Sequence, residues 1–212
     1  VYDCMTKLFG RSAPLDTYLA VWTPPADDRR GICECEWSSS QGLVTDPSRI
    51  NYFEYAHRVF HIWNAFDPTG INYRSRAEQW FVEGANYYYD SKVLVDYGLF
   101  RELRETDMAY YLDWYLRVIV GTKYDVALTE ADRYADWGSF NEYTWLYYRK
   151  GALISLLLDS TIKAITSERK SLDDLMKSVY SGYGAMRGVL SNEDMLSILN
   201  SMTGFDFRTF FD

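Results

Sequence analysis

From residue 46 onward, apolar side chains recur at the three- and four-residue spacing of amphipathic helices. Asp46-Pro47 is a typical start, because aspartate caps a helix and proline suits its first turn. Gly98 and Gly121 each follow an apolar run, and glycine is the usual residue just past a helix end. The pattern therefore predicts four long helices, over residues 46–64, 77–97, 100–120 and 139–165.

Two shorter helices are predicted near the carboxyl end. Ser171 and Ser191 are each followed three positions later by an aspartate, Asp174 and Asp194. A serine at the N-cap with an acidic residue at the third helical position resembles a capping box, in which the two side chains satisfy each other's backbone amides. We expect a helix to begin at each serine.

The first part of the chain has a different pattern. Residues 17–22 and 31–37 are short runs rich in apolar and aromatic side chains, separated by a proline-containing turn, and they predict two strands. We therefore expect an α+β fold that is predominantly α-helical. It would be one domain, with a β-rich edge over 1–45 and a helical part over 46–212.

Composition excludes several classes of function. The formal charge of −8 argues against nucleic-acid and anionic-membrane partners, and three cysteines argue against a disulfide framework. No apolar run approaches the roughly 20 residues that cross a bilayer, and no signal peptide is visible. The compartment stays open, with the cytoplasm preferred. Because the chain starts abruptly at Val1 and stops at Asp212, we expect it to be a fragment of a longer protein.

Aromatic side chains make up 17% of the chain. Burial in the core is the usual explanation for such a content, and a groove lined with rings is the alternative.

The chain contains two histidines, His57 and His61, four positions apart in the first predicted helix. Residues at i and i+4 lie on one helix face, so both imidazoles can reach one metal ion. A catalytic zinc site needs a third protein ligand. Glu83 lies in an apolar run of the next predicted helix, where an unpaired carboxylate would be costly. These three residues form the predicted zinc site.

The residues around these ligands resemble the M61 (glycyl aminopeptidase) family, which is related to the M1 aminopeptidases and thermolysin. Trp63-Asn64 follows the second histidine, Trp80 and Gly84 flank Glu83, and Tyr148-Arg-Lys-Gly matches a Y-x-K-G motif of M1 and M61 enzymes. The resemblance covers nearly the whole chain and implies a thermolysin-like, or gluzincin, catalytic domain that binds Zn²⁺ and a peptide or peptide-like ligand. Flanking β-rich and PDZ-like domains are implied in the full-length protein.

The resemblance also implies roles for three further residues. Tyr148 would donate a hydrogen bond to the oxyanion of the reaction, and Tyr143 would assist it. Glu36 would hold the free amine of an aminopeptidase substrate.

The chain departs from the family pattern at Arg58. The family's H-E-x-x-H motif has a glutamate here, which serves as the general base, whereas a guanidinium has no acceptor and stays protonated. Another carboxylate, Glu54 or Glu142, would have to replace it for hydrolysis. Alternatively, Arg58 anchors a carboxylate ligand or pairs with Glu36, which would make the chain a binding module. A third possibility is a metal-free relic. We expect zinc to be retained and peptide hydrolysis to be impaired or lost.

Overall fold

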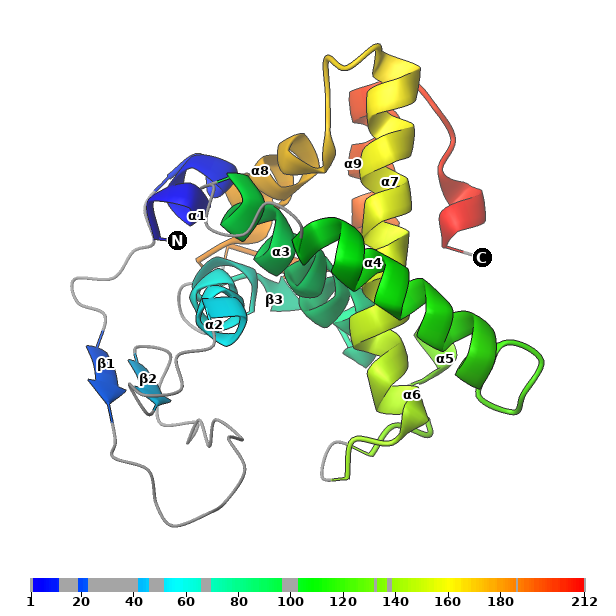
Figure 1. The fold of residues 1–212 in the computed structure, drawn as a ribbon. Helices are drawn as coiled ribbons and strands as arrows, with labels where there is room; N and C mark the ends of the chain where they lie inside the picture. The colour runs from blue at the N-terminus through cyan, green and yellow to red at the C-terminus, as the bar shows by residue number, and fades with distance from the viewer. Residues whose placement is uncertain are drawn as a thin grey trace.

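Helices dominate the computed structural model of this chain (Figure 1). The structure describes residues 2–11, 19–22, 42–45, 52–65, 70–96, 103–131, 133–136, 139–185 and 187–211. The α-helices are α1 (Tyr2–Phe9), α2 (Tyr52–Asn64), α3 (Asn86–Asp96), α4 (Leu103–Trp114), α5 (Leu128–Ala131), α6 (Glu142–Trp145), α7 (Gly151–Thr166), α8 (Leu172–Tyr183) and α9 (Asn192–Thr203). Shorter helical segments are η2 (Arg76–Glu78), η3 (Trp80–Ala85), η4 (Tyr115–Ile119), η5 (Leu146–Lys150) and η6 (Arg208–Phe210).

The four long predicted helices are confirmed, and three of them change their winding along their length. The first is α2, and the part of its prediction before residue 52 lies outside the described residues. The other three correspond to η2, η3 and α3, to α4 and η4, and to α6, η5 and α7. Each of these three includes a π-helical segment, namely η3, η4 or η5. Such wide turns are rare and frequently mark functional sites.

Both predicted capping boxes are present. The Ser191 amide donates to the Asp194 carboxylate at 2.9 Å, and the Asp194 amide donates to the Ser191 hydroxyl at 3.2 Å. The Ser171 amide likewise donates to Asp174 at 2.9 Å. These bonds satisfy amides that the first helical turn leaves without partners, so α8 and α9 begin where the sequence predicts.

The β structure differs in part from the prediction. Strand β1 (Leu19–Trp22) confirms the predicted strand at 17–22, whereas 31–37 lies outside the described residues. The observed partner of β1 is β2 (Gly42–Thr45), which the pattern does not predict, and the two strands are parallel. A second parallel pair joins β3 (Asn72–Tyr73) to β4 (Val189–Leu190). The division of the chain at residue 45 stays a prediction.

Helix α1 is a further difference, because the sequence pattern predicts no helix there. Its Phe9 ring stacks on Trp63 of α2 at a centroid distance of 5.7 Å and meets Tyr180 of α8 edge-on at 5.4 Å. The three rings are almost fully buried. Many other aromatic side chains are likewise buried in the core, and this accounts for much of the aromatic content.

Helix α3 lies centrally, between α2 on one side and α4 and α7 on the other (Figure 1). Within the described part of the chain, no helix combines the length and the apolar character needed to cross a membrane.

Two glycines allow the segment η3 to pack against η5 and α7. A Cβ atom on Gly84 would lie 2.7 Å from the backbone oxygen of Tyr147, and one on Gly151 would lie 2.8 Å from that of Trp80. Both distances are too short for real carbon–oxygen contacts. The two backbones therefore approach each other at positions where neither residue has a side chain.

We predict that Gly84→Ala lowers the free energy of unfolding by about 1–3 kcal/mol, because the added methyl group meets backbone that cannot rotate away. Gly182→Ala is the matched control. Gly182 lies in α8 with nothing within 4 Å of the added Cβ, so alanine there should be neutral or slightly stabilising. Urea denaturation of both variants measures the difference, and equal stabilities would contradict the close-packing argument.

Candidate metal centre

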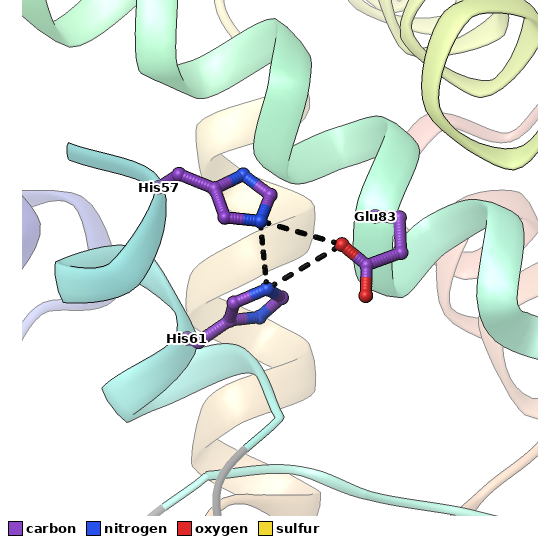
Figure 2. Close-up of side chains that lie close together, drawn as sticks. All are labelled: His57, His61 and Glu83. Carbon is purple, nitrogen blue, oxygen red and sulfur yellow. Dashed lines mark hydrogen bonds and ion pairs between the residues drawn. The ribbon is translucent and has the colours of Figure 1, made fainter. Parts of the chain in front are cut away.

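The three predicted zinc ligands lie together in the structure. His57 and His61 lie on successive turns of α2, and Glu83 lies on η3 (Figure 2). Their exposed fractions are 5%, 4% and 8%, so all three are buried. They form the one group of three or more histidine, cysteine or acidic side chains found in the described residues that has the spacing of a metal site.

The distances between the ligand atoms fit a zinc ion. The Nε2 atoms of His57 and His61 are 3.1 Å apart. Glu83 Oε2 lies 3.5 Å from His57 Nε2 and 3.4 Å from His61 Nε2. A tetrahedral zinc with bonds of roughly 2.0–2.2 Å would separate neighbouring ligand atoms by about 3.3 Å. Glu83 Oε2 is buried, and the polar atoms near it among the described residues are the two imidazole Nε2 atoms. A zinc ion between these three atoms would accept a lone pair from each of them.

Gln79 orients the carboxylate of Glu83. Its side-chain amide donates to Glu83 Oε1 at 3.1 Å, one helical turn away. This bond occupies one carboxylate oxygen and leaves the other, Oε2, facing the two histidines (Figure 2). Gln79 therefore fixes which oxygen is available to the metal.

Asp90 of α3 orients His57. Its Oδ2 lies 3.0 Å from His57 Nδ1, and its side chain is fully buried. A carboxylate can only accept this bond, so Nδ1 carries the proton and, in the neutral imidazole, Nε2 presents a lone pair toward His61 and Glu83. Carboxylate–histidine pairs of this kind commonly support zinc sites.

Sequence reasoning missed Asp90, although a signal existed. Asp90 is an acidic residue that directly follows three tyrosines, at positions 87–89. The argument that an apolar context makes a carboxylate costly, which selected Glu83, applies to Asp90 as well.

The charges of the site are coupled. Burial opposes protonation of His57, but the charge and hydrogen bond of Asp90, together with Glu83, raise its pKa above the ordinary value. Burial also lowers the pKa of His61, and the charges of His57 and Arg58 lower it further against the opposing effect of Glu83. Burial would raise the pKa of Glu83, yet both histidines hold it well below the ordinary range. Glu83 is therefore ionised, the form that binds a metal.

The predicted Tyr148 lies close to the ligands. It is on η5, only 8% exposed, and its ring is 6.3 Å from that of His57. Tyr87 contacts both rings, at 5.5 Å from His57 and 4.8 Å from Tyr148. The structure thus places the Tyr148 ring near the candidate metal centre, and its role as an oxyanion donor stays a prediction.

The other predicted site residues have different positions. The Tyr143 hydroxyl donates to the backbone oxygen of Lys123 at 3.1 Å, and its ring packs on Tyr124 and Tyr134. Its assisting role stays a prediction. Arg58 is partly buried beside His57, and Glu36 lies outside the described residues.

Comparisons with known proteins identify the fold. No family model and no curated protein matches the chain. Among solved structures, an aminopeptidase N family protein from Idiomarina loihiensis is similar, with a TM-score of 0.72 and 20% identity over 97% of this chain. An M1 zinc metallopeptidase from Deinococcus radiodurans, a glutamate-to-alanine mutant with a bound Tyr-Ser-Ala substrate, gives a TM-score of 0.60 and 16% identity over 98%. The same mutant in a second structure gives 0.58 and 15%.

These similarities define the class of fold. The chain has a predominantly helical α+β fold, similar to the thermolysin-like domain of these aminopeptidases. It spans 39–41% of the length of these structures.

Removing Asp90 should weaken zinc binding while leaving the three ligands in place. We predict that Asp90→Ala lowers the zinc affinity by about 10- to 100-fold, because His57 loses the partner that fixes its tautomer and its ring orientation. Asp96→Ala on the same helix is the control, since Asp96 pairs with Lys92 on the surface. Competition with a chromophoric chelator measures both affinities. An unchanged affinity in Asp90→Ala would show that Asp90 does not support the site.

Proposed function

We propose that this chain is an M61-like, aminopeptidase-type zinc metallopeptidase domain that binds zinc through His57, His61 and Glu83 and has impaired or lost peptide hydrolysis. The observation that carries the proposal is the convergence of three buried ligand atoms at 3.1–3.5 Å from one another. The orienting bonds from Gln79 and Asp90 support it, because a site that needs a fixed ligand geometry needs such partners.

The loss of hydrolysis follows from the chemistry of Arg58. When bound, zinc supplies a Lewis acid that polarises a peptide carbonyl. A base must still accept a proton, and general acid–base catalysis is worth roughly 10²- to 10⁴-fold in rate. Arg58 cannot accept a proton. Of the two carboxylates that could replace the base, Glu142 lies on α6, and the side chain of Glu54 lies outside the part of the structure that is described.

The other catalytic function implied by the resemblance is the hydrogen bond of Tyr148 to a developing oxyanion. The position of its ring near His57 supports this role.

A second candidate is a binding module for a peptide or another carboxylate ligand. It is favoured by the position of Arg58, which follows His57 directly and whose charge reaches His61. A guanidinium can bind a carboxylate through two parallel hydrogen bonds, which the family's glutamate cannot do. In this case the chain would hold a ligand without cleaving it.

Metal analysis tests the zinc site directly. We predict about one zinc per chain in protein purified without chelators, and loss of that zinc in His61→Ala, because two remaining ligands hold the ion poorly. Elemental analysis measures both. Wild-type protein that contains no zinc and does not bind added zinc would support the metal-free alternative.

Substitution of Arg58 tests the catalytic part of the proposal. We predict that Arg58→Glu raises the rate of hydrolysis of aminoacyl and short peptide substrates by about 10²-fold or more, because it supplies a general base next to His57. Arg58→Gln is the matched control, since it removes the charge without adding a base. A wild-type activity that is equal in Arg58→Gln and absent in His57→Ala would contradict the loss of function. A zinc-loaded but inert Arg58→Glu would contradict the assignment of Tyr148.

A further inference from the structure

Two buried asparagines connect the helices that carry the metal ligands. The histidines lie on α2, whereas Glu83 lies on η3, and the two segments are separated in the chain by residues 65–79. A metal site requires its ligands to be held to within about 0.5 Å. The backbones of α2 and η3 must therefore be fixed relative to each other.

Asn86, at the start of α3, bonds to the backbone of a ligand residue. Its side-chain amide donates to the backbone oxygen of His57 at 3.1 Å. Asn64, at the end of α2, bonds in the opposite direction. Its amide donates to the backbone oxygen of Val82 at 2.9 Å, immediately before Glu83. Helix α2 thus contributes Asn64, which bonds to the residue before Glu83. The continuous helix formed by η3 and α3 contributes Asn86, which bonds to His57.

The carbonyls that accept these bonds are able to do so within a helix. A backbone oxygen has two lone pairs, so it can accept a side-chain bond in addition to a helical one. Asn64 and Asn86 are both fully buried. A hydrogen bond is stronger in such buried surroundings than in water. If it is lost, the buried amide has no water molecule to bond to instead, and this costs stability.

The orientation of the Asn64 amide is also fixed. The hydroxyl of Tyr73 donates to Asn64 Oδ1, so the nitrogen end must point toward η3. Tyr73 belongs to β3, which pairs with β4 and is thereby anchored to the carboxyl-terminal part of the chain. The bond from Asn64 to Val82 is therefore part of a connected network rather than an isolated contact.

Asn86 shows that stability alone does not explain these residues. Its Oδ1 is buried and has no hydrogen-bond partner among the residues that the structure describes. A half-satisfied buried amide costs stability compared with an apolar side chain of similar size. The bond that it does make ends on His57, a metal ligand.

We propose that Asn64 and Asn86 form a reciprocal clamp that sets the separation of α2 and η3, and that they act as positioning residues for zinc binding. The inference deepens the proposed function and rests on zinc binding by His57, His61 and Glu83. It assigns no catalytic contact to either asparagine.

The test uses Asn64→Ala, Asn86→Ala and the double variant. We expect each single variant to bind zinc about 10- to 100-fold more weakly than wild type, as is typical when groups outside the ligand set are lost. Because both bonds fix the same separation, the double variant should lose less affinity than the product of the two single losses. The visible absorption spectrum of bound Co²⁺ should change in all three, since the ligand geometry changes.

Asn200→Ala is the matched control. Asn200, in α9, accepts a bond from the Phe207 amide, and none of the hydrogen bonds seen in the described residues joins it to His57, His61 or Glu83. It should lower the melting temperature without changing the zinc affinity or the Co²⁺ spectrum. If an alanine variant does not fold, the corresponding leucine variant, Asn64→Leu or Asn86→Leu, is measured in its place. Leucine keeps the buried volume and removes the same hydrogen bonds.

The outcomes separate the clamp from the proposed function. Folded clamp variants that bind zinc as tightly as wild type, with an unchanged Co²⁺ spectrum, would overturn the clamp and leave the zinc site intact. Wild-type protein that binds no zinc would overturn both. An inert Arg58→Glu variant would count against the catalytic proposal alone, because the binding measurements on the asparagine variants do not depend on hydrolysis.

Discussion

The close approach of η3 to the segment formed by η5 and α7 is the constraint on which the metal centre depends. Gly84 and Gly151 make this approach possible, because a side chain at either position would meet backbone of the opposite segment. Glu83 precedes the first glycine, and Tyr148 lies three residues before the second. The separation of the two backbones therefore governs the separation of the carboxylate ligand and the tyrosine. The Glu83-Gly84 pair and the segment from Tyr148 to Gly151 therefore form the two sides of this backbone contact.

The winding of these segments serves the same geometry. Glu83 and Tyr148 both lie on π-helical turns, η3 and η5. A π turn adds a residue to the helix and rotates the following side chains relative to an α-helix. Glu83 can then face α2, while α3 continues with Asp90 directed at the first histidine. A straight α-helix over the same residues would have different side-chain directions at these two positions.

Much of the fold could be predicted from the sequence because the signals are local. Apolar periodicity and terminal glycines or prolines predict the long helices, and the serine–aspartate pairs predict the starts of α8 and α9. Helix α1 and strand β2 are short, so their existence depends on what they pack or pair with elsewhere. The π turns could not be predicted either, because no residue type marks them in the sequence.

The candidate site divides in a similar way. His57 and His61 are found from spacing within one helix, and Glu83 from a carboxylate in an apolar run. Asn64 and Asn86 contact backbone carbonyls about twenty to thirty residues away, and a single sequence does not reveal which carbonyl a buried amide reaches. If the proposed clamp holds, part of the geometry of this candidate metal centre is set by residues other than its ligands.

In the proposed function, Arg58 removes the general base and leaves the three candidate ligands in place. It follows His57 in the helix, so its side chain projects about 100° away from that of His57 and about 60° away from that of His61. Its positive charge repels a cation, but it also helps to lower the pKa of His61, which favours the neutral imidazole that a metal requires. The electrostatic cost to metal binding is thus partly offset at the second histidine. The guanidinium also has no lone pair to accept a proton, so in the proposed function a single residue would separate zinc binding from hydrolysis.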